Sequence, residues 1–174
     1  MRMLRGIGGA LLWATAALGV LSGALWIAHA LGWVQPLVVV SGSMEPGIRR
    51  GDLLFALPVP ATDVDVGEVT SLPSPLDGVL VTHRVIEVTP EGESLSIRME
   101  GDANGTPDGQ PYPVPAASSV WQPMLTVPGA GTAVIALSRP AVAIPLAVAV
   151  LALIALTLLP PPSPRQRARE SEVT

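Results

Sequence analysis

Three short stretches of the chain carry residue types that can perform nucleophilic chemistry. They are the turn Ser41-Gly42-Ser43-Met44-Glu45-Pro46, the run Thr82-His83-Arg84 and the loop from Gly101 to Asp108. A serine hydroxyl stays protonated at neutral pH, so a neighbouring base must take its proton while the new bond forms. The three stretches supply a nucleophile, a base and candidate acids in the chain order Ser, His, Asp, which favours hydrolysis through an activated serine.

His83 is the residue best suited to be that base. Its unperturbed pKa of about 6.5 suits proton transfer near neutral pH, and the β-branched run around it predicts a strand that would hold the ring rigidly. The other histidine, His29, falls at the end of an apolar segment and is interpreted as interfacial. Asp102 and Asp108 both follow in a glycine-rich loop, and either can accept a hydrogen bond from histidine Nδ1. The spacing alone does not choose between them.

Composition excludes several other kinds of chemistry. The chain has no cysteine and no lysine, which excludes a disulfide framework, a thiolate metal site and any lysine base. Residues 32–139 contain twelve acidic residues and five arginines, a net charge of −7, so this region would repel the phosphates of a nucleic acid. We therefore expect a site that uses no cofactor and no metal, and a protein with no nucleic-acid partner.

Two apolar segments are long enough to be membrane helices. Ile7–Leu31 contains no full charge, and the nineteen residues of Ala141–Leu159 would form about 28 Å of helix against a hydrocarbon core of about 30 Å. Two arginines precede the first segment, and residues 165, 167 and 169 after the second are also arginines. The positive-inside rule therefore places both termini in the cytoplasm and the residues between the segments outside.

A removable signal peptide is the alternative interpretation of the first segment. A short basic start precedes it, and Ala28-His29-Ala30 has the small-x-small form of a cleavage site. Its apolar stretch, however, exceeds the roughly 7 to 15 residues of a signal peptide's hydrophobic region. A retained anchor is therefore the preferred interpretation.

The region between the two segments has a β pattern, with β-branched runs separated by glycine and proline. It predicts a small, mostly antiparallel β-barrel or folded sheet of about 100 residues between two transmembrane α-helices. Residues 132–137 are expected to form a short helix or strand before the second span. The predicted strands are Pro36–Val40, Asp52–Leu57, Glu68–Leu72, Val79–Val88, Ser94–Met99 and Ser118–Val127.

These segments predict a multi-pass protein of the cell membrane with four parts. Residues 1–33 would be an N-terminal cytoplasmic stub and transmembrane helix, and residues 34–139 an extracytoplasmic catalytic domain. Residues 140–160 would be the second transmembrane helix. Residues 161–174, which are rich in proline and then arginine, would be a disordered cytoplasmic tail.

The chemical motifs, taken together, resemble a known family. The serine turn, Arg50-Gly51-Asp52, Thr82-His83-Arg84-Val85-Ile86 and Gly101-Asp102-x-Asn104 followed by Asp108 are similar to the motifs of the type I signal peptidases. The similarity is to the branch of the endoplasmic reticulum, archaea and sporulating bacteria, in which histidine replaces the lysine base. It extends from about Pro36 to Arg139, but Trp121-Gln122-Pro123 departs from the glycine and basic pattern expected before the last strand.

The resemblance assigns expected roles to individual residues. It implies that Ser43 is the acylating nucleophile, His83 the general base and Asp108 the acid of the relay, with Asp102 as a structural or supporting carboxylate. The Ser43 backbone N–H and the Ser41 hydroxyl would form the oxyanion hole.

Substrate recognition is expected along the strands that carry these residues. A peptide bond must be extended to reach a serine at the edge of a sheet, and strand addition provides that extension without strong sequence demands. The flanking residues would form shallow apolar pockets for small side chains, as in an Ala-x-Ala site. The residues expected to bind substrate are Val38, Val40, Met44, Leu80 and Thr82.

The expected function is therefore that of a membrane-bound serine endopeptidase. It would cleave N-terminal signal peptides from exported preproteins through an acyl-enzyme, with the lipid bilayer holding enzyme and substrate together. A maturation protease for one dedicated substrate and a catalytically silent membrane scaffold are the alternatives. The sequence does not distinguish the plasma membrane from the endoplasmic reticulum.

Overall fold

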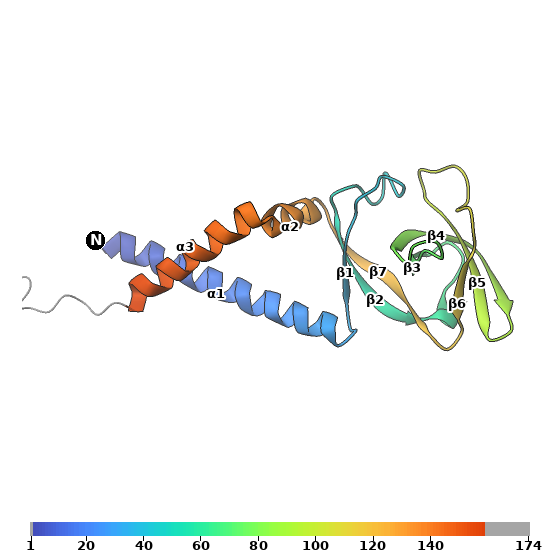
Figure 1. Cartoon of the computed structure of the whole chain (residues 1–174), viewed down its shortest axis with the longest axis horizontal. Helices are drawn as coiled ribbons and strands as arrows, with labels where there is room; N and C mark the ends of the chain where they lie inside the picture. Colours follow the sequence, from blue (N-terminus) through green and yellow to red (C-terminus); the bar gives the residue numbers. More distant parts are fainter. Residues whose placement is uncertain (1, 159–174) are drawn as a thin grey trace, which may run out of the picture. The chain divides into compact units, whose positions relative to one another are not determined.

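The computed structural model describes residues 2–158 of the chain (Figure 1). The predicted tail at 161–174, with the three arginines used to predict the topology, lies outside the described residues. The chain divides into two compact units, Met1–Thr132 and Ala133–Thr174.

The first unit begins with helix α1 (Arg2–Ala30), which contains most of the first predicted span. Its segment Trp13–Ala30 is long and apolar enough to cross a membrane. Gly32 follows the helix with a φ of 71°, and its N–H donates to the His29 carbonyl. A glycine in this left-handed conformation commonly ends a helix because it has no Cβ to clash with the backbone. The helix therefore stops just before the first strand.

Seven antiparallel strands form one strongly curved sheet, which confirms the predicted mostly β, antiparallel fold of the region between the two apolar segments. The sheet is an open half-barrel in the order β1-β2-β7-β3-β4-β5-β6 (Figure 1). All six predicted strands are present. The strands are β1 (Gln35–Val38), β2 (Leu53–Pro60), β3 (Val69–Pro73), β4 (Leu80–Glu91), β5 (Ser94–Glu100), β6 (Tyr112–Pro115) and β7 (Ser119–Val127).

The sequence did not predict β6. Its four residues, Tyr-Pro-Val-Pro, include two prolines, which lack a backbone N–H and normally argue against a strand. Because β6 lies at the edge of the sheet and pairs with β5 alone, only one side of its backbone enters the ladder. Proline is tolerated at such an edge.

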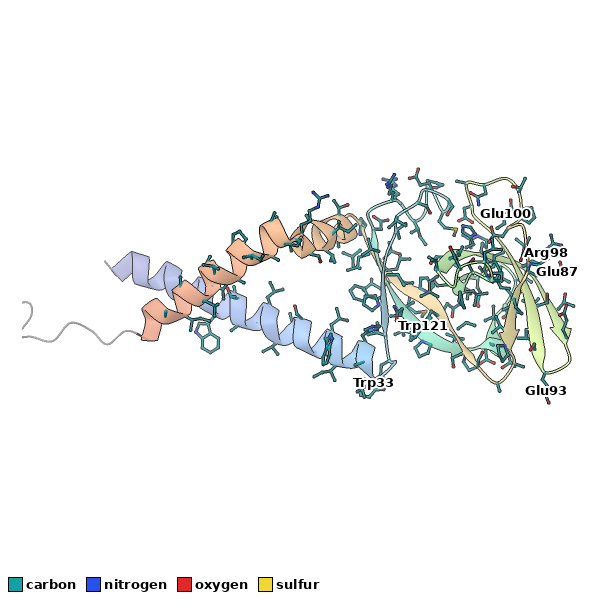
Figure 2. The ribbon with its side chains drawn as sticks, in the orientation of Figure 1. Trp33, Glu87, Glu93, Arg98, Glu100 and Trp121 are labelled. Atoms are coloured by element: carbon teal, nitrogen blue, oxygen red, sulfur yellow. The ribbon has the colours of Figure 1, made fainter. Side chains whose placement is uncertain are left out.

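The core lies on the inner face of this sheet. In β5 the side chains of Leu95, Ile97 and Met99 are buried, whereas Arg98 between them is exposed. Arg98 pairs across the strands with the exposed Glu87, and both side chains lie on the outer surface (Figure 2). This alternation places apolar side chains inward and charged ones outward, as a half-buried sheet requires.

The second unit follows a boundary that falls inside helix α2 (Ala130–Ser138). Residues 132–137, predicted as a short helix or strand, are helical. Helix α3 (Pro140–Leu158) coincides with the predicted second span to within one residue at each end. The pair α2 and Pro140–Ala152 is long and apolar enough to be a span, but it is bent by 79°. A second membrane crossing remains a prediction.

Candidate active site

Ser43 lies in the loop between β1 and β2, and this loop is held on two sides. The Ser43 carbonyl accepts a hydrogen bond of 2.8 Å from the N–H of Ala103, in the loop after β5. The next side chain, Met44, is buried in the core. The serine is therefore held between the interior of the sheet and a second loop that is distant in sequence.

Gly101 makes the close approach of these two loops possible. A Cβ atom at this position would lie 2.7 Å from the Ser43 carbonyl oxygen and 2.8 Å from the Asn104 amide nitrogen. Real Cβ atoms do not come this close to other atoms, so the backbone at Ser43 would have to move. Glycine is required here for space, not for an unusual backbone angle.

Asp52 ties the other end of the serine loop to the end of the sheet. Its carboxylate accepts the N–H of Arg49 at 2.9 Å and the N–H of Gly129 at 2.9 Å. These two hydrogen bonds, the one from Arg49 first, hold the pKa of the buried Asp52 carboxyl below its usual value. The loop that carries Ser43 is thus anchored to the segment just after β7.

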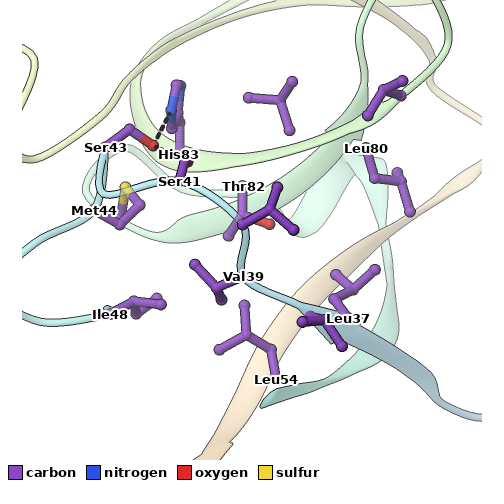
Figure 3. Close-up of a pocket in the computed structure, with 14 residues that line it drawn as sticks. Leu37, Val39, Ser41, Ser43, Met44, Ile48, Leu54, Leu80, Thr82 and His83 are labelled. Atoms are coloured by element: carbon purple, nitrogen blue, oxygen red, sulfur yellow. Dashed lines mark hydrogen bonds between the residues drawn. The ribbon is translucent and has the colours of Figure 1, made fainter. Parts of the chain in front are cut away.

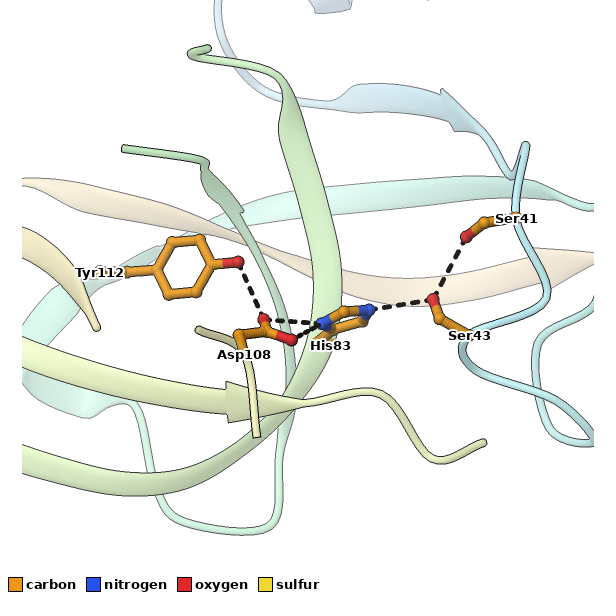
Figure 4. A network of polar contacts seen from close by, with 5 residues as sticks. All are labelled: Ser41, Ser43, His83, Asp108 and Tyr112. Carbon is orange, nitrogen blue, oxygen red and sulfur yellow. Dashed lines mark hydrogen bonds and ion pairs between the residues drawn. The ribbon is translucent and has the colours of Figure 1, made fainter. Parts of the chain in front are cut away.

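His83 lies in β4, and its ring connects Ser43 to Asp108 (Figure 4). Nε2 lies 2.9 Å from the Ser43 Oγ, and Nδ1 lies 2.9 Å and 2.8 Å from the two carboxylate oxygens of Asp108. The Asp108 backbone N–H donates to the Met99 carbonyl at 2.9 Å, which fixes the aspartate beside β5. A carboxylate on Nδ1 favours the tautomer in which Nε2 is free to accept a proton from the serine.

Asp102 is not bonded to His83 but to its neighbour Arg84. The guanidinium donates from Nε at 2.8 Å and from Nη2 at 2.7 Å to the two carboxylate oxygens, and from Nη1 to the Gly67 carbonyl at 2.7 Å. This paired hydrogen bond lowers the pKa of Asp102 and raises that of Arg84. Of the two aspartates that the sequence left as candidates, the structure therefore places Asp108 against the imidazole and Asp102 in a bridge between loops.

Ser41, the second serine of the turn, lies beside the first. Its Oγ is 3.2 Å from the Ser43 Oγ (Figure 4). The hydroxyl is therefore close to the position that a substrate carbonyl would occupy when it meets Ser43. A hydroxyl there can donate to a developing oxyanion.

A cavity of about 230 Å³ opens next to Ser43 and His83 (Figure 3). The segments 37–41 and 79–83 form its two sides, and the side chains of Ile48 and Leu54 line it as well. Aliphatic residues dominate the lining, so the cavity favours small apolar groups. All five residues expected to bind substrate line it, namely Val38, Val40, Met44, Leu80 and Thr82.

The sequence motifs did not identify Tyr112, Ile48 or Leu54 as residues of this site. The Tyr112 hydroxyl donates a 2.8 Å hydrogen bond to Asp108 Oδ2. One signal was present, since Tyr112 is the only tyrosine in the chain and follows Asp108 by four positions.

Among residues 2–158, no group of three or more histidine, aspartate or glutamate side chains is arranged to hold a metal ion.

Comparison with known proteins agrees with the hydrolytic chemistry that the geometry of the site indicates. The chain is homologous to signal peptidase catalytic subunits. The signal peptidase complex catalytic subunit sec11 of Penicillium rubens is 40% identical over 79 residues, which is 45% of each chain. The SEC11 subunit of Ajellomyces capsulatus is 37% identical over 110 residues, 53% of this chain and 58% of its own.

A bacterial relative is similar over a comparable length. Signal peptidase I W of Bacillus subtilis is 34% identical over 76 residues, 42% of this chain and 38% of its own. The chain thus spans about half the length of the curated relatives it matches, and no protein-family model matches it. The expected resemblance to type I signal peptidases is confirmed at this level.

Proposed function

We propose that this chain is a membrane-bound serine endopeptidase that removes signal peptides from exported preproteins. One observation carries the proposal. Ser43, His83 and Asp108 form a continuous hydrogen-bonded chain beside an aliphatic cavity, in a protein homologous to signal peptidase catalytic subunits. Fold alone would not support a function, whereas this arrangement of nucleophile, base and carboxylate has a defined chemistry.

The reaction begins with the attack of the Ser43 Oγ on the scissile carbonyl carbon. His83 Nε2 takes the hydroxyl proton as the new C–O bond forms, and Asp108 stabilises the resulting imidazolium through Nδ1–H. The carbonyl oxygen, now negatively charged, accepts hydrogen bonds from the Ser43 N–H and the Ser41 hydroxyl. Removal of one such donor typically lowers kcat by about 10² to 10³.

The tetrahedral intermediate then collapses to an acyl-enzyme. The C–N bond breaks while His83 donates its proton to the leaving amine, which is the new N-terminus of the mature protein. A water molecule attacks the Ser43 ester, giving a proton to His83, and the proton returns to the Ser43 Oγ as the acyl group leaves. The enzyme is restored without any other reactant.

The preprotein would lie extended between segments 37–41 and 79–83. Side chains of an extended peptide alternate in direction, so the first and third residues before the cut would face the same wall. The aliphatic cavity has room for small residues at these two positions, which supports cleavage after small-x-small motifs.

Membrane anchoring is part of the same proposal. Residues 1–33 and 140–160 would each cross the bilayer, with both termini in the cytoplasm and residues 34–139 on the other side. Signal peptides are themselves apolar, so anchoring in one bilayer would raise the effective concentration of substrate near Ser43. Weak contacts in the cavity would then suffice for turnover.

Cleavage of a preprotein in proteoliposomes tests the proposal. A substrate with an Ala-x-Ala site should be cut by the wild-type protein and not detectably by Ser43→Ala or His83→Ala. Ser119→Ala, which removes an exposed serine from the start of β7, and His29→Ala are matched controls that should retain cleavage. Cleavage by Ser43→Ala at the wild-type rate would remove the mechanism, whereas no cleavage by the wild-type protein would favour a scaffold. Comparison of exported proteins with and without the enzyme would separate general export from one dedicated substrate.

A further inference from the structure

The carboxylate of Asp108 accepts hydrogen bonds from two different side chains. Its Oδ2 lies 2.8 Å from His83 Nδ1 and also receives the Tyr112 hydroxyl at 2.8 Å, while Oδ1 lies 2.9 Å from Nδ1 (Figure 4). Tyr112 thus extends the chain of Ser43, His83 and Asp108 by one residue. Neither the sequence motifs nor the expected roles include it.

Tyr112 holds its hydroxyl in a fixed position because its ring is part of the core. The side chain is 5% exposed, and the ring belongs to the buried cluster that also contains Val85 and Met99. Its backbone pairs with Ile97 of β5. The hydroxyl can move away from Asp108 only if the edge strand β6 or the core moves with it.

We propose that Tyr112 is a positioning residue for the proton relay, which fixes the Asp108 carboxylate so that its two oxygens face His83 Nδ1. The proposal rests on the function argued above. Without the phenol, Asp108 would be attached by its backbone N–H to Met99 and by His83 alone. Rotation of the carboxylate would then be opposed only by the ring that it has to orient.

The hydroxyl also distributes the negative charge of the carboxylate. Burial, followed by the hydrogen bond to Asp108, raises the pKa of Tyr112, so the phenol remains a donor throughout the neutral range. A donor on Oδ2 weakens the attraction between the carboxylate and a protonated His83. Removal of the hydroxyl should therefore strengthen the attraction between the Asp108 carboxylate and a protonated His83.

Other charged groups also lie near the residues of the relay. Asp102 acts on His83 through space, but it is paired with Arg84. Asp77 acts on Tyr112 through space. Replacement of the phenol hydroxyl leaves all three of these charges in place, so a change in the His83 titration reports on Asp108.

The test is Tyr112→Phe in the full-length protein, with the His83 ring followed by NMR as a function of pH. The substitution keeps the ring in the core and removes one oxygen. We expect the His83 ring to hold its proton to a higher pH than in the wild type and its Nδ1–H resonance to broaden. Preprotein cleavage should show kcat lowered roughly 10-fold, as for a lost hydrogen bond to a charged group, with KM nearly unchanged.

Val114→Ala is the matched control, because Val114 is buried on the same strand and has no hydrogen bond to the relay. It should weaken β6 without moving the His83 titration. Asp108→Asn provides a second comparison, since Tyr112→Phe should cost much less activity in that background than in the wild type.

Two results would overturn the proposal. One is an unchanged His83 titration in Tyr112→Phe, and the other is an equal shift in Val114→Ala, which would indicate a general loosening of β6. The titration requires no substrate. Should the wild type fail to cleave the preprotein while Tyr112→Phe still changes the His83 titration, the two claims would separate. That result would remove the proposed function and support the contact between Tyr112 and Asp108.

Discussion

Substitution of Gly101 by alanine should lower the kcat of preprotein cleavage by displacing the backbone of Ser43. The new Cβ would lie 2.7 Å from the Ser43 carbonyl oxygen, whereas ordinary contacts begin at 3.4 Å, so the two must separate by about 0.7 Å. The other close atom, the Asn104 amide nitrogen, is at the end of a flexible side chain and can rotate away. The Ser43 oxygen is a backbone atom, and it also accepts the hydrogen bond of Ala103.

The displacement is large compared with the tolerance of the relay. If Ser43 moves directly away from His83, the distance between Oγ and Nε2 rises from 2.9 Å to about 3.6 Å, beyond hydrogen-bond range. Misplacement by about 1 Å typically costs 10²-fold in rate, so a decrease in kcat of roughly 10-fold to 100-fold is expected. KM should change less, because the walls of the cavity come mainly from other segments.

Gly109→Ala is the matched control for this prediction. Gly109 lies in the same loop, a Cβ added to it would meet no atom within 4 Å, and its φ is not positive. The kcat of this variant for a preprotein should stay within about twofold of the wild type. Both variants should be assayed well below their melting temperatures, measured by circular dichroism. A Gly101→Ala protein that cleaves at the wild-type rate would refute the reasoning about the Ser43 carbonyl.

Three further predictions concern the carboxylates and the cavity. Asp108→Asn should lower kcat by about 10³ to 10⁴, whereas Asp102→Asn should lower it by less than about tenfold and mainly reduce the melting temperature; equal losses would contradict the assignment. The Asp52 pKa is lowered by folding, so its contribution to stability is present above the unfolded value of 3.8 and is lost as the pH falls through the folded value. Melting curves from pH 5 to pH 2 should therefore fall more steeply for the wild type than for Asp52→Asn, and parallel curves would argue against this. Ile48→Ala should enlarge the cavity and raise the kcat/KM of a substrate with valine before the cut by about tenfold relative to alanine, which competition between the two substrates would measure.

The strands of the sheet were predictable because their residues have strong local preferences. β4, with Val81, Val85 and Val88 in a continuous run, is recognisable from β-branched residues alone. β6 was not, because its two prolines oppose a strand and only its position at the edge of the sheet makes them acceptable. An edge position is a property of the whole topology, which no window of sequence contains.

The site was predictable as a set of residue types but not as a set of contacts. A serine followed along the chain by a histidine is the pattern of a nucleophile and its base, so Ser43 and His83 could be chosen from the sequence. Asp102 and Asp108, by contrast, are chemically identical and only six positions apart. Their partners differ because the loop turns between them, so that one carboxylate meets Arg84 and the other meets the imidazole. Tyr112 was missed for a related reason, since a buried tyrosine in a strand is explained by packing until the position of its hydroxyl is known.

Nucleophile and base are held in different ways, and this difference has consequences for the effects of mutations. His83 is carried by the interior strand β4, which is hydrogen-bonded to β3 on one side and to β5 on the other. Ser43 lies on a loop whose position depends on separate anchors, the N–H of Ala103 and the carboxylate of Asp52 at its far end. Loss of one anchor can shift the serine while the sheet remains folded, because the ladder does not include these contacts. Mutations around the loop should therefore lower kcat at little cost in stability, whereas mutations around β4 should lower both.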